Sequence, residues 1–223
     1  CSILDVLVRP EVDLAPHFLA ATFQASSLLP ACVDLFVAAP QNASSTIAVS
    51  VLSLFLTLAT HPSLSELLVL SGLMVALSNN ASTAALEAGA VVSRSSGGEH
   101  NPQHQCWLVM LRIVASLCVC FGETLQSAAS QTFVETEVAS FVRLYQAQIE
   151  KALSMSPVSF VATELSGMFD EEERFSYEAD LEEVEAVVYL LVAVTGSDAL
   201  DNSVINRFAL RAANLLQQMT YLL

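Results

Sequence analysis

The residues of this chain that could carry out chemistry are few, and they do not form a complete catalytic or metal-binding set. His100, His104 and Cys106 resemble part of a metal site, but a fourth ligand at a suitable distance is missing. The sequence has no glycine-rich phosphate loop and no G-x-S-x-G, H-E-x-x-H or C-x-x-C motif. We therefore expect no bound metal, no cofactor and no enzymatic activity. A pocket of polar groups around His17, His61 or the acidic residues would revive the enzyme hypothesis.

Acidic side chains are concentrated between positions 170 and 185. Acid–base catalysis would need a desolvated pocket that raises the pKa of one carboxyl group, and the sequence gives no sign of such a pocket. A solvated loop explains the run at 170–173 without any function, and acidic residues in the first turns of a helix at 178–194 complement its dipole. The functional alternative is an acidic docking patch for a basic peptide segment. Its candidate residues are Asp170, Glu171, Glu172, Glu173, Glu182 and Glu183.

The bulk composition favours a helical protein with much of its surface covered by neighbours. The 223 residues are 54% hydrophobic and only 14% charged, whereas about 25% charged residues is usual in soluble domains. Glycine and proline number 7 each, which favours helices over a strand-and-turn fold. The formal net charge of −15 argues against direct nucleic-acid binding and against binding to anionic membranes.

The five cysteines, at irregular spacings within apolar runs, do not resemble a disulfide framework. We expect them to be reduced and mostly buried, as in a cytosolic or nuclear protein. The chain starts at Cys1 without an initiator methionine and ends in an apolar segment. These ends suggest an excised fragment of a longer chain.

The hydrophobic periodicity predicts helices along almost the whole chain. Capping boxes are expected at Ser63 with Glu66 and at Thr132 with Glu135. The segment 154–177 is predicted to be a connection with a short helix at 160–165. The predicted helices cover residues 13–29, 30–39, 46–60, 63–70, 73–77, 84–92, 106–121, 132–153, 178–194 and 201–222.

Two of these helices, at 46–60 and 106–121, are apolar around most of their circumference. Each is shorter than the roughly 20 residues that a membrane span requires, and Arg112 interrupts the second. We therefore predict two core helices and no transmembrane segment.

The three last helices have apolar stripes and should pack around 106–121. The packed face of 178–194 is expected to contain Leu181, Val184, Val188, Leu191 and Val192, and that of 201–222 to contain Leu215 and Leu216.

The order of long apolar helix, His-Pro, short helix, Ser-Gly-Leu and short helix resembles armadillo or HEAT repeats, without a strict internal period. The predicted class is thus all-α, an irregular armadillo/HEAT-like helical repeat. Residues 1–92 form armadillo-like helical units, and the small and polar residues 93–103 form a loop. Residues 104–223 form a helical C-terminal part of the same α-solenoid.

Three sequence blocks are similar to the C-terminal region of the very large inner-ring scaffold nucleoporins. The blocks are QCWLVML at 105–111, FVRLYQAQI at 141–149 leading to Ala152 and Leu153, and LEEVEAVVYLL at 181–191. This resemblance implies an α-solenoid segment of a nuclear pore scaffold that supports nucleocytoplasmic transport. The implied partners are other scaffold and linker nucleoporins, and the implied location is the nuclear envelope.

A second hypothesis is a free-standing armadillo/HEAT-type adaptor, or a module like a transport receptor, that binds peptides. A parent protein of well over about a thousand residues would favour the scaffold hypothesis, because solenoids grow by stacking similar units. A parent of a few hundred residues would favour the adaptor.

Overall fold

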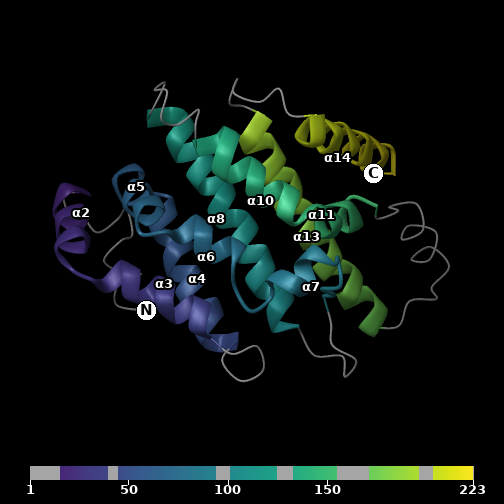
Figure 1. Ribbon diagram of the computed structural model, residues 1–223. Coiled ribbons are helices and arrows are strands. Elements are labelled where there is room, and N and C mark those ends of the chain that lie inside the picture. Colours follow the sequence, from purple (N-terminus) through teal and green to yellow (C-terminus); the bar gives the residue numbers. More distant parts are fainter. Residues whose placement is uncertain are drawn as a thin grey trace.

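The computed structural model describes residues 16–39, 45–93, 101–124, 133–154, 171–195 and 203–222. Every regular element in these ranges is a helix, so the all-α prediction is confirmed (Figure 1). Of the predicted loop at 93–103, residues 94–100 lie outside the described residues, as does the predicted short helix at 160–165. For the last two residues of that loop the prediction is wrong, because α8 already begins at Pro102. The helices are α2 (Pro16–Ala25), α3 (Leu28–Ala38), α4 (Ser45–Ala59), α5 (Pro62–Leu70), α6 (Leu73–Ser78), α7 (Thr83–Glu87), α8 (Pro102–Thr124), η1 (Val134–Val138), α10 (Ala139–Leu144), α11 (Gln146–Ala152), α13 (Glu171–Thr195) and α14 (Ser203–Leu222).

The long helix α8 lies at the centre, with α4 on one side and α13 on the other (Figure 1). Its apolar circumference explains this place, because a helix that is apolar all round must be covered on several sides. Among the described residues, Pro102–Phe121 is the helix long and apolar enough to cross a membrane by length and composition, and most of it is buried within the protein. The core helices of soluble proteins have the same properties, so the predicted absence of a membrane span stays a prediction.

The two halves of the chain share one hydrophobic core. Side chains from α4 and α5 in the first half and from α8, α10 and α13 in the second belong to the same buried cluster. The ends of the segment between the halves are held together, since Asn101 donates hydrogen bonds to the carbonyl groups of Val92 and Ser93, at 2.8 and 3.0 Å. The polar segment that begins at position 93 therefore does not divide the hydrophobic core into two parts.

An aromatic cluster joins α8 to the helices that follow it. The rings of Trp107 and Tyr145 meet edge to face at 5.3 Å between centroids, and those of Phe141 and Tyr145 at 4.9 Å. The Tyr145 hydroxyl donates to the carbonyl oxygen of Leu77 at 2.6 Å. At Tyr145 the backbone leaves the helical conformation (φ −99°, ψ 22°). The prediction of a single helix at 132–153 is therefore wrong, because η1, α10 and α11 follow one another in this segment. Burial of Tyr145 and its bond to Leu77 accompany this break.

Two helix ends differ from the prediction for identifiable reasons. The capping box of Ser63 and Glu66 is wrong: α5 starts at Pro62, follows His61 and has no side-chain cap. Proline suits the first helical position because the missing N–H would be unpaired there anyway. The helix predicted at 84–92 ends at Glu87, since Gly89 adopts a left-handed φ of 65°. A Cβ at Gly89 would lie 3.2 Å from the Ala147 carbonyl oxygen, so α11 also restricts this position.

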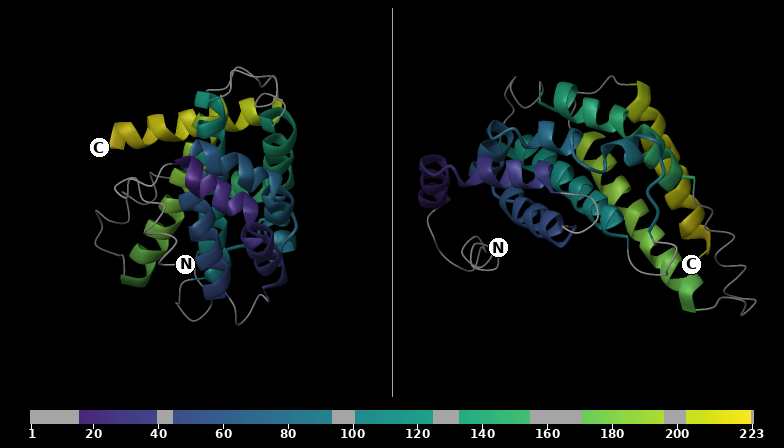
Figure 2. Two further views of the ribbon diagram at one scale, coloured as in Figure 1. Left: turned by 90° about the vertical axis from the view of Figure 1, so that its left-hand side faces the viewer. Right: turned by 60° about the horizontal axis from the view of Figure 1, so that its bottom comes forward.

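The last two helices lie on the far side of α8 from α4. Helix α13 packs against α8, α11 and α14, and α14 also contacts α10. In the left view of Figure 2, α14 runs crosswise over the end of the other long helices and its C-terminal part projects beyond them. Helix α13 begins at Glu171 and not near 178, so residues 171–173 are its first turn and not a loop. This crosswise arrangement leaves part of α13 uncovered between α8 and α14.

Candidate functional site

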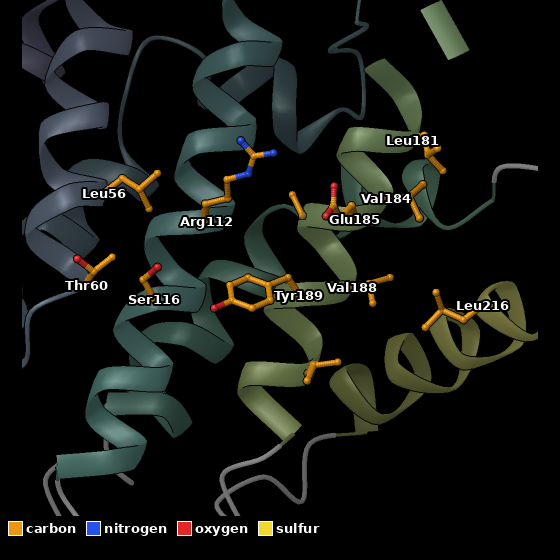
Figure 3. A pocket seen from close by; sticks show the side chains of 12 residues that line it. Leu56, Thr60, Arg112, Ser116, Leu181, Val184, Glu185, Val188, Tyr189 and Leu216 are labelled. Carbon is orange, nitrogen blue, oxygen red and sulfur yellow. The ribbon is translucent and has the colours of Figure 1, made fainter. Parts of the chain in front are cut away.

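A groove of about 760 Å³ crosses the surface between α4, α8, α13 and α14 (Figure 3). Its lining is almost entirely apolar, and most of it comes from α13. In Figure 3, Tyr189 extends from α13 toward α8, with its hydroxyl on the side of Ser116. The lining residues are Leu56, Thr60, Arg112, Ser116, Leu181, Val184, Glu185, Ala186, Val188, Tyr189, Val192 and Leu216.

Three apolar side chains of this groove are open to solvent. Val192 is 62% exposed, Tyr189 48% and Leu216 45%. Helical spacing explains why α13 presents two apolar faces: Val187, Leu190 and Leu191 are buried, while Tyr189 and Val192 lie on the open side. The predictions that Val192 and Leu216 belong to packed faces are therefore wrong. Apolar residues occupy more of the circumference of α13 than the neighbouring helices bury.

One ion pair lies at the groove. The Arg112 guanidinium donates from Nη2 to Oε1 of Glu182 at 2.8 Å, with both side chains partly exposed. This contact joins α8 to α13 and gives Arg112 the partner that sequence could not identify. Exposed pairs of this kind contribute about 0–1 kcal/mol to stability, so its main effect here is to neutralise the arginine. Glu185 lines the groove one turn further along and makes no ion pair with the described residues.

A buried polar cluster fixes the opposite side of α13. The Glu183 carboxylate accepts hydrogen bonds from Trp107 Nε1 at 2.7 Å and from Gln148 Nε2 at 2.8 Å. His104 Nε2 lies 3.2 Å from the other carboxylate oxygen of Glu183. All four side chains are buried, and together they connect α8, α11 and α13. Because hydrogen bonds are directional, this cluster sets the rotation of α13 and hence which of its residues face the groove.

Next to this cluster, the Val91 carbonyl oxygen accepts from Gln148 Nε2 at 3.1 Å and from Lys151 Nζ at 2.6 Å. Gln148 Oε1 is buried and has no hydrogen-bond partner among the described residues. Since the amide of Gln148 donates to both Glu183 and Val91, its orientation is determined by these two acceptors. The segment before α8 is thereby tied to α11.

Of the six residues of the predicted acidic patch, the structure places the side chains of Glu182 and Glu183, and it places them apart. Glu183 is buried among hydrogen-bond donors, so it is not available to a partner. Glu182 is paired with Arg112 at the groove. Asp170 lies outside the described residues, as do the side chains of Glu171, Glu172 and Glu173 in the first turn of α13. Adjacent residues of a helix point about 100° apart, so Glu182 and Glu183 could not share one face.

The structure places two of the three residues that resemble part of a metal site, His104 and Cys106. Among the described residues, no group of three or more His, Cys, Asp and Glu side chains could hold a metal ion. His104 contacts Glu183, and His100 lies outside the described part of the chain. His61 precedes the first residue of α5. The polar groups of His104 and Glu183 are buried in the core and do not line the groove.

The described cysteines are free thiols. Cys106, Cys118 and Cys120 are buried in α8, and Cys32 is partly buried in α3. Burial raises the pKa of Cys106 to about 11 and that of Cys118 to about 12, because a thiolate is poorly solvated in an apolar core. The Cys120 thiol contacts the Ala59 carbonyl oxygen at 3.1 Å, which joins α8 to α4. The raised pKa values keep Cys106 and Cys118 protonated at neutral pH, which disfavours reactions of these two thiols.

The groove was missed by sequence analysis, although part of its signal is present. Tyr189 and Val192 follow Glu182 and Glu185 at steps of three and four, which places all four on one helical stripe. Such a stripe, acidic at one end and apolar at the other, indicates an amphipathic surface. Sequence spacing does not show that this stripe faces a groove formed with α4 and α14, because that arrangement depends on tertiary packing.

Comparisons with protein-family models, with curated proteins and with solved structures found no match to this chain. The similarity of the three sequence blocks to inner-ring scaffold nucleoporins therefore stays a prediction.

Proposed function

We propose that this chain is a structural scaffold and adaptor segment of the nuclear pore complex that supports nucleocytoplasmic transport by binding other nucleoporins. Its arrangement in this proposal is an irregular armadillo/HEAT-like α-solenoid within the nuclear envelope. Scaffold and linker nucleoporins are the partners.

The observation that carries the proposal is the open apolar groove between α4, α8, α13 and α14. Exposed contiguous apolar surface on a soluble protein marks interaction sites more often than isolated apolar residues do. Val192, Tyr189 and Leu216 come from two helices and meet in one groove. A surface of this kind suits an adaptor, which must present an apolar face to another chain.

The blocks that resemble the nucleoporin family add support because they meet in space. Trp107 of the first block donates its indole N–H to Glu183 of the third, and its ring contacts Phe141 and Tyr145 of the second. Similar residues that form one core are better evidence of a shared architecture than similar residues scattered over the surface.

The test is the location of the protein in its own cells, tagged at the chromosomal locus and imaged with a scaffold nucleoporin as reference. The proposal predicts a punctate nuclear rim that coincides with the reference. A diffuse cytoplasmic or nucleoplasmic signal that exchanges rapidly after photobleaching would overturn it and would favour the free-standing adaptor.

A further inference from the structure

We propose that the groove binds an amphipathic helix of a partner protein that carries Lys or Arg beside its apolar stripe. This inference rests on the proposed function only in treating the groove as the docking surface, and it adds the chemistry of what docks there. Glu182 and Glu183 of the predicted acidic patch do not line the groove, and Asp170 and the side chains of Glu171, Glu172 and Glu173 lie outside the described residues.

The shape of the groove fits a helix. Helix α13 forms the floor, with α8 and α4 on one side and α14 on the other, and Tyr189 points toward α8 while Val188 points toward α14 (Figure 3). Amphipathic helices bind such grooves through apolar anchors at positions i, i+3, i+4 and i+7. Tyr189, Val192 and Leu216 would contact these anchors, and their present exposure would be lost.

The charge of the groove selects a basic partner. Arg112 is neutralised by Glu182, which leaves the Glu185 carboxylate as the lining charge that makes no ion pair with described residues. Helix α4 has no charged residue, and on α14 Arg207 pairs with Glu150 while Arg211 does not line the groove. With a formal net charge of −15, the chain as a whole also attracts cations.

The positions along α13 define the spacing that the partner needs. Glu185 and Val192 are seven residues apart, which is about 10.5 Å along a helix at 1.5 Å per residue. For a partner helix that lies along α13, the basic residue and the last apolar anchor are therefore about two turns apart. An acidic helix would place its carboxylates beside Glu185, where like charges repel.

The test uses the whole 223-residue chain and three synthetic helical peptides of about 18 residues with one shared leucine stripe. Their flanking positions carry Lys, Gln or Glu, and binding is measured by fluorescence anisotropy. We expect the Lys peptide to bind most tightly and the Glu peptide most weakly. With Glu185→Lys, this order should reverse, since the lining charge changes sign.

Val192→Asp should weaken the Lys peptide at least about tenfold, because it places a charge among the apolar anchors. The matched control is Val75→Asp: Val75 is 67% exposed on α6, away from the groove. Far-ultraviolet circular dichroism checks that each variant is folded. Tyr189→Ala, which removes the exposed ring without adding charge, gives the same readout should Val192→Asp not fold.

The inference is overturned if the three peptides bind equally or not at all, if Glu185→Lys leaves their order unchanged, or if the groove variants bind like the Val75→Asp control. These outcomes are separable from those of the nuclear-rim test. A protein at the rim that binds no peptide overturns the partner chemistry alone, whereas peptide binding by a protein absent from the rim overturns the nuclear pore assignment alone.

Discussion

Replacing Glu183 tests whether the buried polar cluster holds α13 in place. Glu183→Ala leaves the indole N–H of Trp107 without its acceptor and removes one of the two acceptors of Gln148 Nε2. Each buried polar group that loses its partner costs about 1–3 kcal/mol, so the expected loss in the free energy of unfolding is about 3–5 kcal/mol with the small cavity included. That is a large fraction of the roughly 5–15 kcal/mol that stabilises a domain.

The matched control is Glu185→Ala, two residues along the same helix. Glu185 is exposed and makes no ion pair with the described residues, so its removal should change stability by no more than about 0.5 kcal/mol. Glu183→Gln keeps the shape and one acceptor oxygen and should lie between the two. Urea unfolding followed by far-ultraviolet circular dichroism measures all three. Equal midpoints for Glu183→Ala and Glu185→Ala would refute the structural role of Glu183.

Four further changes have expected outcomes. Phe141→Asp buries an unpaired charge in the core and should abolish cooperative unfolding in circular dichroism, while Val75→Asp should not. Tyr145→Phe removes the hydroxyl bond to Leu77 and should cost about 1 kcal/mol in urea unfolding. Arg112→Ala should cost no more than about 1 kcal/mol in the same assay. Burial raises the pKa of Cys118 from 9.0 to about 12, so the folded state binds its proton more tightly, and Cys118 should lower stability by up to about 1.4 kcal/mol per pH unit above pH 9. Replacement of Cys118 by Ala should reduce the slope by this amount and leave the contribution of Cys106, whose pKa is raised to about 11.

The helical class and the place of the central helix could be predicted because local signals agreed there. The sequence of α8 lacks a polar face wide enough for a solvent-exposed helix, which predicts burial on several sides. In the structure, α4 and α13 pack against α8. Helix ends were predicted less well, since they depend on neighbours. Ser63 was an acceptable cap by sequence, but Pro62 already fits the first turn.

The candidate site could not be predicted because side-chain partners come from distant parts of the chain. Glu182 and Glu183 are neighbours in an acidic segment, yet Glu182 faces Arg112 at the groove and Glu183 faces Trp107 in the core. Each partner is 70 or more residues away in sequence. Val192 fits an apolar stripe equally well whether a neighbour covers it or not, so its exposure depends on the crosswise position of α14.

The central claim, that the groove is the surface through which this chain binds nucleoporins, is tested most directly by site-specific photo-crosslinking in living cells. A photoreactive phenylalanine analogue replaces Tyr189 in the groove or, as the control, Val75 on α6. We expect covalent adducts with scaffold or linker nucleoporins from position 189 and none from position 75. Adducts that are the same from both positions, or that contain no nucleoporin, would contradict it.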